Sequence, residues 1–266
     1  MIIPFPFSYS SLSTWASCPH KFKLHYIDKS DVFDDNIYMY FGKLIHNVLH
    51  KHFTNEISKK DFEARALEMW KEEWFKNWDD RFINEKFKLQ IEAKFQFFEA
   101  GNAAIVKLYD NLHKVFKKEC KGPYKIINKE QKYTIDYATK DGAQIQLTGI
   151  IDIELENEKG KNIIVDYKSS KDSTTYKNPP MSKLYQLNLY KHIYEAHYQK
   201  EAYKMFFVVV PRKYDKIVVV PCENKMDGLF EWIDNIVWGV QNDIFYKRKG
   251  CPDCFMCEYN KTQYCP

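Results

Sequence analysis

The feature that most constrains the fold is an apolar strand segment that is followed at once by charged residues. Ile163, Ile164 and Val165 form a run without polar side chains, which is typical of a strand covered on both faces of a sheet. Asp166 and Lys168 come next in the sequence. Because side chains alternate along a strand, these two charges are predicted to lie on the same side of the sheet. The segment therefore predicts a buried sheet that carries charge on one side.

A second carboxylate is expected beside the first. Asp152 ends another largely apolar run, at 147–151, that also reads as a strand. Two facing carboxylates repel each other unless a cation lies between them, and a hard divalent ion such as Mg²⁺ or Mn²⁺ prefers oxygen ligands. Such an ion lowers the pKa of a bound water and neutralises charge on a phosphodiester. The pair therefore predicts a divalent metal site, with Lys168 holding the attacking hydroxide or the transition state.

A predicted helix adds two further polar side chains. Gln186 and Tyr190 are four residues apart, so they share one helix face and can position a substrate phosphate or a metal-bound water. Each feature is common by itself, because an Asp-x-Lys pair is often an exposed ion pair and Gln with Tyr often lies at the rim of a core. Their order along the chain favours phosphodiester chemistry: a hairpin with Asp152, then the Asp-x-Lys strand, then this helix.

In that order the segments resemble the PD-(D/E)XK nuclease superfamily, and within it the RecB-like branch of RecB and AddB nuclease domains and CRISPR-associated spacer-processing exonucleases. The resemblance implies an α/β fold with a restriction-endonuclease-like core, in which helices flank a mixed sheet. It also implies that Asp152 and Asp166 bind the metal ion and that Lys168 is the catalytic lysine. The backbone carbonyl of Tyr167 would be a further ligand. The second acidic position is Asp here rather than Glu, a variant that the branch commonly uses.

Further motifs of the branch are present on predicted helices. Gln186 and Tyr190 match its Gln-x-x-x-Tyr motif, and Gly42 and His46 match an upstream Gly-x-x-x-His motif whose imidazole joins the metal ligands. The resemblance thus implies that His46 binds metal. The alternative is a solvated helix rich in lysine and histidine, since two more histidines follow closely. Glu130, in a predicted strand, is a weaker candidate for the acidic residue that the family often places there.

Cysteine is the second notable constellation. Four of the seven cysteines lie in the last sixteen residues. The apolar start at 1–7 is too short and lacks the basic residues of a secretory signal, so a cytoplasmic location is expected, in the host cytoplasm if the protein is viral. Clustered thiols in that reducing compartment favour a metal centre over disulfides, and four thiolates suit either tetrahedral zinc or an iron–sulfur cluster. Cys120 and Cys222 are expected to be ordinary thiols.

The family resemblance favours an iron–sulfur cluster, because many RecB-like nucleases hold [4Fe-4S] with one cysteine before the nuclease core and three after it. The implied ligands are Cys18, Cys254, Cys257 and Cys265. Cys251 also forms a Cys-x-x-Cys pair with Cys254 and competes for a place, and a zinc-stapled tail is the alternative. Such a metal centre joins distant segments of the chain, so its role is expected to be structural. In a simple polymer picture, closing the loop costs several kcal/mol of chain entropy, which metal binding must supply.

Length and composition predict one compact unit. The 266 residues are 45% hydrophobic, which is enough for a core, and no run approaches the length of a membrane span. We expect a helical region at 1–120 with the first cluster cysteine and the metal-site histidine, a nuclease core at 121–222, and a final helix with the cysteine tail at 223–266. The predicted helices are 11–27, 41–53, 59–78, 86–118 and 227–246 with one around Gln186, and the predicted strands are 124–138, 144–155, 162–168, 204–210 and 216–220.

Charge and motif content set the expected partners. The net charge is only +4, so local patches such as the lysine-rich 114–125 and the basic 247–249 are expected to follow a DNA backbone. No P-loop is present, so any helicase or ATPase is a separate protein. The sequence as a whole favours an iron–sulfur-containing, Mg²⁺- or Mn²⁺-dependent DNA exonuclease that acts on ends or single strands in recombination, repair or viral DNA processing.

By family analogy, a helicase, a recombinase or a CRISPR-adaptation protein is the expected protein partner, and membranes are not expected. Three alternatives stay open: a DNA-binding or scaffolding subunit of a nuclease complex, a CRISPR-adaptation end-processing nuclease, and a structural zinc protein without hydrolytic activity. The complete set of polar motif residues argues against a binding-only role, since a protein that only binds would tolerate their loss.

Overall fold

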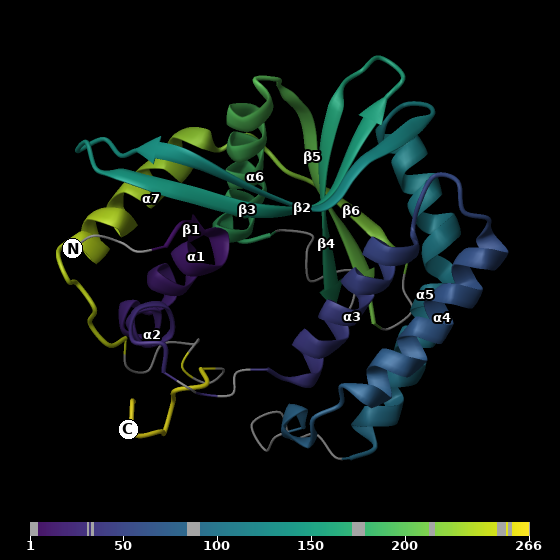
Figure 1. Ribbon diagram of the computed structural model, residues 1–266, viewed down its shortest axis with the longest axis horizontal. Helices are drawn as coiled ribbons and strands as arrows, with labels where there is room; N and C mark the ends of the chain where they lie inside the picture. Colours follow the sequence, from purple (N-terminus) through teal and green to yellow (C-terminus); the bar gives the residue numbers. More distant parts are fainter. Residues whose placement is uncertain are drawn as a thin grey trace.

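A mixed sheet of six strands runs through the middle of the protein (Figure 1). The computed structural model describes residues 5–30, 32, 35–83, 91–171, 179–212, 216–248, 254 and 257–265. The strand order is β1-β3-β4-β5-β6, and β2 also pairs with β3. β1 with β3 and β4 with β5 are parallel, and the other pairs are antiparallel. The strands are β1 (Phe7–Ser8), β2 (Tyr124–Ala138), β3 (Gln144–Asn157), β4 (Asn162–Ser170), β5 (Ala202–Pro211) and β6 (Val218–Pro221).

Helices cover the sheet from two sides (Figure 1), with α3, α4 and α5 on one side and α1, α6 and α7 on the other. Their bounds are α1 (Tyr9–Ser17), α2 (Pro19–Phe22), α3 (Ile37–His52), α4 (Lys59–Lys76), α5 (Ala93–Glu119), α6 (Met181–Tyr198) and α7 (Met226–Gln241). A π-helical turn at Lys23–Ile27 follows α2, and a 3₁₀ turn at Asp80–Phe82 follows α4. None of these helices combines the length and the apolar character that crossing a membrane requires.

The strand predicted to be buried on both faces is confirmed. Ile163 and Val165 pack into the core under α3, α4 and α5, whereas Ile164 packs into the core under α6 and α7. β5 behaves in the same way, because Phe206 faces the first core and Phe207 the second. The α/β fold with a mixed sheet flanked by helices, which the motifs implied, is what the structure shows.

Helix α3 carries part of the candidate site, and its local sequence fixes its position. The Asn36 side chain caps its start by accepting hydrogen bonds from the backbone N–H groups of residues 38 and 39, at 3.0 and 3.1 Å. Phe41, Leu44 and Val48 are buried at helical spacing and hold the helix against the sheet. Gly42 lets α3 approach β4, since a Cβ atom at Gly42 would lie 2.8 Å from the Ser169 Oγ atom.

The sheet divides at β3, and this division creates the space for the site. β3 pairs with β1 through Leu147 and Thr148, and with β4 only from Ile153 to Glu156. Between these two stretches β3 and β4 separate, and Figure 1 shows the β2–β3 hairpin extending away from β4 toward β1 and α1. Asp152 stands where the two strands part.

Several predicted boundaries differ from the structure. The predicted helix at 11–27 is broken at Cys18, whose backbone is extended (φ −154°, ψ 107°) before Pro19 starts α2, because proline suits the first helical turn but disfavours helix in the residue before it. The final helix ends at Gln241 rather than at 246. The helix predicted from residue 86 begins at Ala93, with 84–90 outside the described residues. The short strand β1 was not predicted.

Candidate metal and catalytic site

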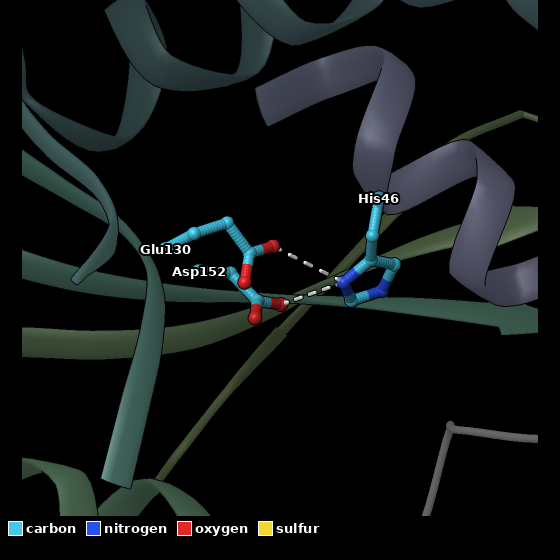
Figure 2. Close-up of side chains that lie close together, drawn as sticks. All are labelled: His46, Glu130 and Asp152. Carbon is cyan, nitrogen blue, oxygen red and sulfur yellow. Dashed lines mark ion pairs between the residues drawn. The ribbon is translucent and has the colours of Figure 1, made fainter. Parts of the chain in front are cut away.

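Three side chains converge where the strands part (Figure 2). His46 comes from α3, Glu130 from β2 and Asp152 from β3. The His46 Nδ1 atom lies 3.7 Å from Glu130 Oε1 and 3.5 Å from Asp152 Oδ2. One ligand atom from each residue lies within 4.8 Å of the others, and among the described residues this is the only such group of three or more histidine, cysteine or acidic side chains. The group offers one imidazole nitrogen and two carboxylate oxygens to a single ion.

The Asp152 carboxylate also bridges the two separating strands. Its Oδ2 atom accepts a hydrogen bond of 2.7 Å from the backbone N–H of Tyr167 on β4. The antiparallel register would place Tyr167 opposite Ile151, but the strands have already parted there. The side chain of Asp152 thus makes the contact between β3 and β4 at a position where their backbones no longer pair.

Glu130 reaches the group because the backbone of β2 is irregular. Its φ angle is +50°, in the left-handed region that residues other than glycine rarely adopt. A shift of register also lies just before it, between Ile126 and Asn128. A non-glycine residue in such a conformation costs about 1–3 kcal/mol and is found most often at functional sites. The weaker candidate of the sequence therefore lies inside the observed ligand group.

Burial and neighbouring charges favour protonation of this group. Burial and the neighbouring charge of Asp166 together raise the pKa of Asp152 to about 7. Burial alone would lower the pKa of His46, but the hydrogen bond to Glu130 and the charges of Asp152 and Asp166 raise it above its usual value. A cation between these side chains would take over the role of the protons.

Asp166 and Lys168 lie on the same side of β4, as the alternation of strand side chains predicted. The Asp166 carboxylate is 1% exposed, and its Oδ2 atom lies 2.5 Å from the Lys168 Nζ atom. On α6, the Gln186 Nε2 atom donates to Asp166 Oδ1 at 3.2 Å and to the Tyr190 hydroxyl at 3.1 Å. The four predicted residues therefore form one connected polar group, whose catalytic role stays a prediction.

The two polar groups are neighbours but not one ligand set. The charges of Asp166 and Lys168 shift the pKa values of both His46 and Asp152, yet no Asp166 oxygen belongs to the close group of three. The Asp166 Oδ2 atom is paired with the Lys168 ammonium, whereas the buried Gln186 Oε1 atom makes no hydrogen bond. Buried oxygens normally have partners, so the Gln186 oxygen fits a site that a bound group completes.

Gly149 stands on β3 three residues before Asp152, and sterics require a glycine there. A Cβ atom at Gly149 would lie 2.9 Å from the Tyr190 Cδ1 atom and 3.2 Å from the Ile193 Cδ1 atom. β3 therefore approaches α6 so closely that only glycine fits without displacing Tyr190. The strand that carries Asp152 therefore packs closely on the tyrosine of the Gln-x-x-x-Tyr motif.

A second lysine, which the sequence analysis did not single out, lies near Lys168. Lys183 is one turn before Gln186 on α6, and its Nζ atom lies 5.6 Å from the centre of the Tyr9 ring. Burial lowers its pKa, and the charge of Lys168 lowers it further. The site therefore has two ammonium groups whose charges repel each other.

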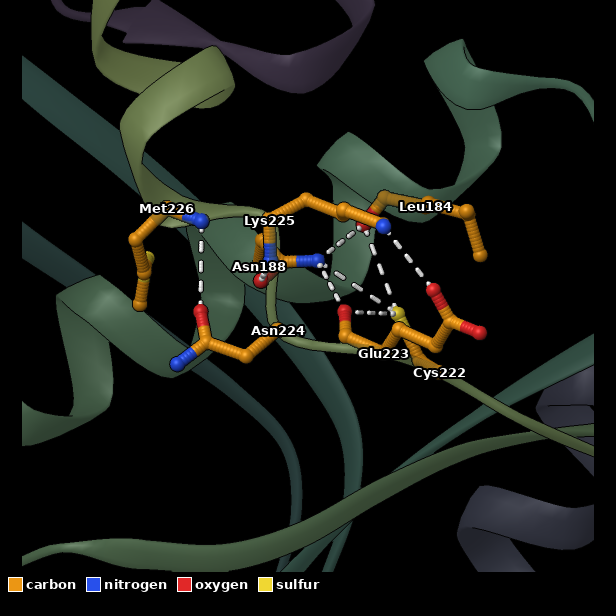
Figure 3. Close-up of polar contacts among 7 residues, drawn as sticks. All are labelled: Leu184, Asn188, Cys222, Glu223, Asn224, Lys225 and Met226. Atoms are coloured by element: carbon orange, nitrogen blue, oxygen red, sulfur yellow. Dashed lines mark hydrogen bonds and ion pairs between the residues drawn. The ribbon is translucent and has the colours of Figure 1, made fainter.

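Helix α6 is anchored by Asn188, whose side chain is fully buried (Figure 3). Its Nδ2 atom donates to the carbonyls of Leu184 and Glu223, at 2.9 and 3.0 Å, and its Oδ1 atom accepts from the backbone N–H of Lys225 at 2.8 Å. These bonds tie α6 to the connection between β6 and α7. Asn188 stands between Gln186 and Tyr190 in sequence, so the same helix carries the site on one face and its anchor on another.

The scattered cysteines behave as ordinary thiols, as the sequence analysis expected. Burial raises the pKa of Cys120 to about 11 and that of Cys222 to about 12. Both thiols therefore stay protonated near neutral pH. Cys222 lies against Asn188, with 3.5 Å between its Sγ atom and the Asn188 Nδ2 atom (Figure 3).

The two chain segments that hold the proposed cluster cysteines are in contact. The Lys21 Nζ atom on α2 forms an ion pair of 2.7 Å with Glu258 Oε2, whose side chain is buried. The His20 Nε2 atom lies 3.2 Å from the carbonyl oxygen of Tyr264. α2 begins directly after Cys18, so the tail packs beside that residue, and Figure 1 shows the C-terminal tail below α2.

The sulfur atoms themselves do not form a single-ion site. All four proposed ligands are partly buried, and no three of them belong to a close ligand group in the part of the chain that is described. Cys251, the competing candidate, lies outside the described residues. The proposed ligands are Cys18, Cys254, Cys257 and Cys265.

Comparison with known proteins gives one family. A family model described as the PD-(D/E)XK nuclease superfamily matches residues 6–266. No curated protein matches the chain. Among solved structures, the crystal structure of SSO0001 is similar at 16% sequence identity and a TM-score of 0.37, over 66% of this chain and 78% of that chain.

Proposed function

The chain belongs to the PD-(D/E)XK nuclease superfamily, and from that premise we propose that it is a DNA exonuclease that acts on ends or single strands with Mg²⁺ or Mn²⁺. Metal-dependent phosphodiester hydrolysis follows from the family. The exonuclease activity and the DNA substrate are the finer part of the proposal, supported by the RecB-like order of the sequence motifs. The observation that carries it is the convergence of the ligand group with the buried Asp166–Lys168 pair.

We propose that the metal ion is held by His46, Glu130, Asp152 and Asp166 with the backbone carbonyl of Tyr167. This donor set, one imidazole with oxygens, fits a divalent cation, and the interaction of the Asp166 charge with Asp152 supports the place of Asp166 in the set. Bound there, Mg²⁺ or Mn²⁺ supplies Lewis acidity to the water and to the phosphodiester.

The remaining residues then have distinct roles. Lys168, whose side chain is 17% exposed, holds the attacking water or the negative charge of the transition state. Gln186 orients the Asp166 carboxylate through its 3.2 Å hydrogen bond, and Tyr190 holds Gln186. The charge of Lys183 adds attraction for the phosphate at the same side of α6.

The decisive test is hydrolysis of end-labelled single-stranded and double-stranded DNA in Mn²⁺. Asp152→Asn and Lys168→Ala should each slow product release from the labelled end by at least about a hundredfold, the size of loss when one charge-stabilising group is removed. Asp136→Asn is the matched control, because Asp136 is an exposed acid on the same hairpin and only accepts a hydrogen bond from Gln146. Undiminished hydrolysis in both site variants would contradict the proposed centre. Products cut inside the strand would contradict an exonuclease.

We propose in addition that Cys18, Cys254, Cys257 and Cys265 hold a [4Fe-4S] cluster. The contact of the tail with α2 supports it, since it brings the three tail cysteines toward the first one. Protein purified without oxygen should be brown, with a broad visible absorption band and about four irons per chain. A colourless, zinc-loaded protein would instead support the zinc-stapled tail.

The cellular setting is proposed on family analogy alone. We place the nuclease in the cytoplasm, or in the host cytoplasm if it is viral, in recombination, repair or DNA processing. A helicase, a recombinase or a CRISPR-adaptation protein is its expected partner. Co-purification of the tagged full chain tests this, and a wild-type protein that binds DNA without cutting it in any divalent metal would favour the scaffolding role.

A further inference from the structure

Arg212 lies at the end of β5, beside the aromatic rings of Tyr38 and Phe97. It directly follows Pro211, and its backbone N–H donates to the Ser170 carbonyl on β4 at 2.8 Å. Its guanidinium lies 4.6 Å from the centre of the Tyr38 ring and 5.5 Å from that of Phe97. Among the residues that the structure describes, it forms no ion pair with an acid.

Arg212 lies against the face of α3 that also carries His46. Tyr38, Gly42 and His46 follow one another at four-residue spacing on α3, so they occupy successive turns of one face. Gly42 shows that this face looks toward β4, because it packs on Ser169, the residue after Lys168. At about 1.5 Å of rise per residue, Tyr38 is about 12 Å along the helix from His46.

The chemistry of this spot suits a nucleotide. A half-buried guanidinium loses water, which lowers the pKa of Arg212, and it gains most from an anion that its planar fork can bind with two hydrogen bonds, as phosphate does. Tyr38 is also half-buried, and an aromatic ring beside a basic group is the usual platform for an unpaired base. A purely structural stacking of arginine on aromatic rings is the competing explanation.

We propose that Arg212 and Tyr38 form a second nucleotide subsite, in which Arg212 binds a backbone phosphate and Tyr38 supports a base of the same strand, about 12 Å from the metal ligands. This inference rests on the proposed nuclease function, because it names where the substrate strand runs. The strand passes from the metal site along α3 and over Gly42 and Ser169 to the ends of β4 and β5.

Binding of DNA without cleavage separates this inference from the proposed activity. The dissociation constant of a fluorescently labelled single strand is measured by anisotropy in Ca²⁺ at several salt concentrations, with the full chain. Arg212→Met keeps an unbranched stem on the rings and removes the charge. It should weaken binding by about tenfold and reduce the slope of log affinity against log salt by about one. Arg212→Lys keeps the charge and should restore the slope but only part of the affinity.

The controls decide between binding and structure. Lys159→Ala removes an exposed lysine from the turn before β4, at the opposite end of that strand from Lys168, and should leave both quantities as in wild type. Tyr38→Leu should weaken binding of a normal strand more than that of a strand with abasic positions. The inference is overturned if folded Arg212→Met, judged by its melting temperature, keeps the wild-type affinity and salt slope. It is also overturned if the affinity falls with no change in slope.

Discussion

The metal site and the cysteine tail place their ligands in different ways. In the metal site, His46, Glu130 and Asp152 come from one helix and two paired strands and already lie within 4.8 Å of one another. In the tail, the proposed cluster ligands lie on short turns, such as the one closed by the hydrogen bond from Cys265 N–H to the Thr262 carbonyl. Strand register and helix packing thus bring the first set together, whereas we expect the second set to depend on the group that it binds.

The largest effect is expected from a variant that disrupts the tail and leaves the metal site intact. Cys18→Ser removes the proposed link between the N-terminal helices and the tail, so it should lower the free energy of unfolding by about 5 kcal/mol, the loop-closure term for a link of this length. Chemical denaturation of anaerobically purified protein measures this. Cys222→Ser, which changes a thiol outside the proposed set, should cost about 1 kcal/mol. Equal losses of unfolding free energy in the two variants would contradict the proposed link between Cys18 and the tail.

The next largest effect is expected from a variant that disrupts the metal site and leaves the fold intact. Glu130→Gln keeps the shape of the side chain but removes one carboxylate charge, and it should slow DNA hydrolysis by about a hundredfold, or about 2.7 kcal/mol in the barrier. Mn²⁺ should raise the melting temperature of the wild type by several degrees and that of Glu130→Gln by much less. A variant with wild-type rates and the full Mn²⁺ shift would show that Glu130 lies outside the ligand set.

A smaller effect tests the close approach of Gly149 on β3 to Tyr190 on α6. Gly149→Ala places a Cβ atom 2.9 Å from the Tyr190 ring, so the helix or the ring must shift. We expect a loss of about 1–3 kcal/mol in unfolding free energy, as in other overpacked cores, together with slower hydrolysis. A double-mutant cycle with Tyr190→Leu should show that the loss shrinks when the ring is absent. Additive losses would mean that the contact does not constrain the site.

The smallest effect concerns the anchor of α6. Asn188→Leu keeps the volume but leaves the Glu223 carbonyl and the Lys225 N–H without their buried partner, at about 1–2 kcal/mol. Hydrolysis should fall less than in Glu130→Gln, because Asn188 acts only through the position of α6. Asn224→Ala is the control on the same connection, since its side chain accepts one hydrogen bond from Met226 N–H. Similar losses in both variants would assign the effect to the connection as a whole.

Much of the fold could be predicted because its signals are local. The strand at 124–138 has the predicted bounds, and the run from Ile163 to Val165 is buried on both faces, since apolar pattern and turn residues are enough to place such strands. The side shared by Asp166 and Lys168 follows from strand geometry alone. The break at Cys18 was missed because apolar periodicity continues across it, although Pro19 was a signal that could have revealed it.

The candidate site was less predictable where it depends on distant contacts. Glu130 enters the ligand group through a backbone angle that no residue pattern encodes. Asn188 looks like an ordinary polar residue on a helix, and its burial follows from the path of residues 223–225. Arg212 belongs to no motif in the sequence, and its place near the start of α3 follows only from the path of β5. Asn188 and Arg212 carry no local signal, because their neighbours are supplied by the tertiary fold.

The left-handed backbone of Glu130 sets stability against function at one position. Glycine adopts this conformation without the Cβ penalty, so Glu130→Gly would relieve the local conformation while deleting a carboxylate from the ligand group. A chain optimised for thermal resistance alone would drift to glycine here and lose an oxygen ligand. Retention of an acid at such a position is therefore what selection for metal affinity, acting across homologous chains, should leave behind.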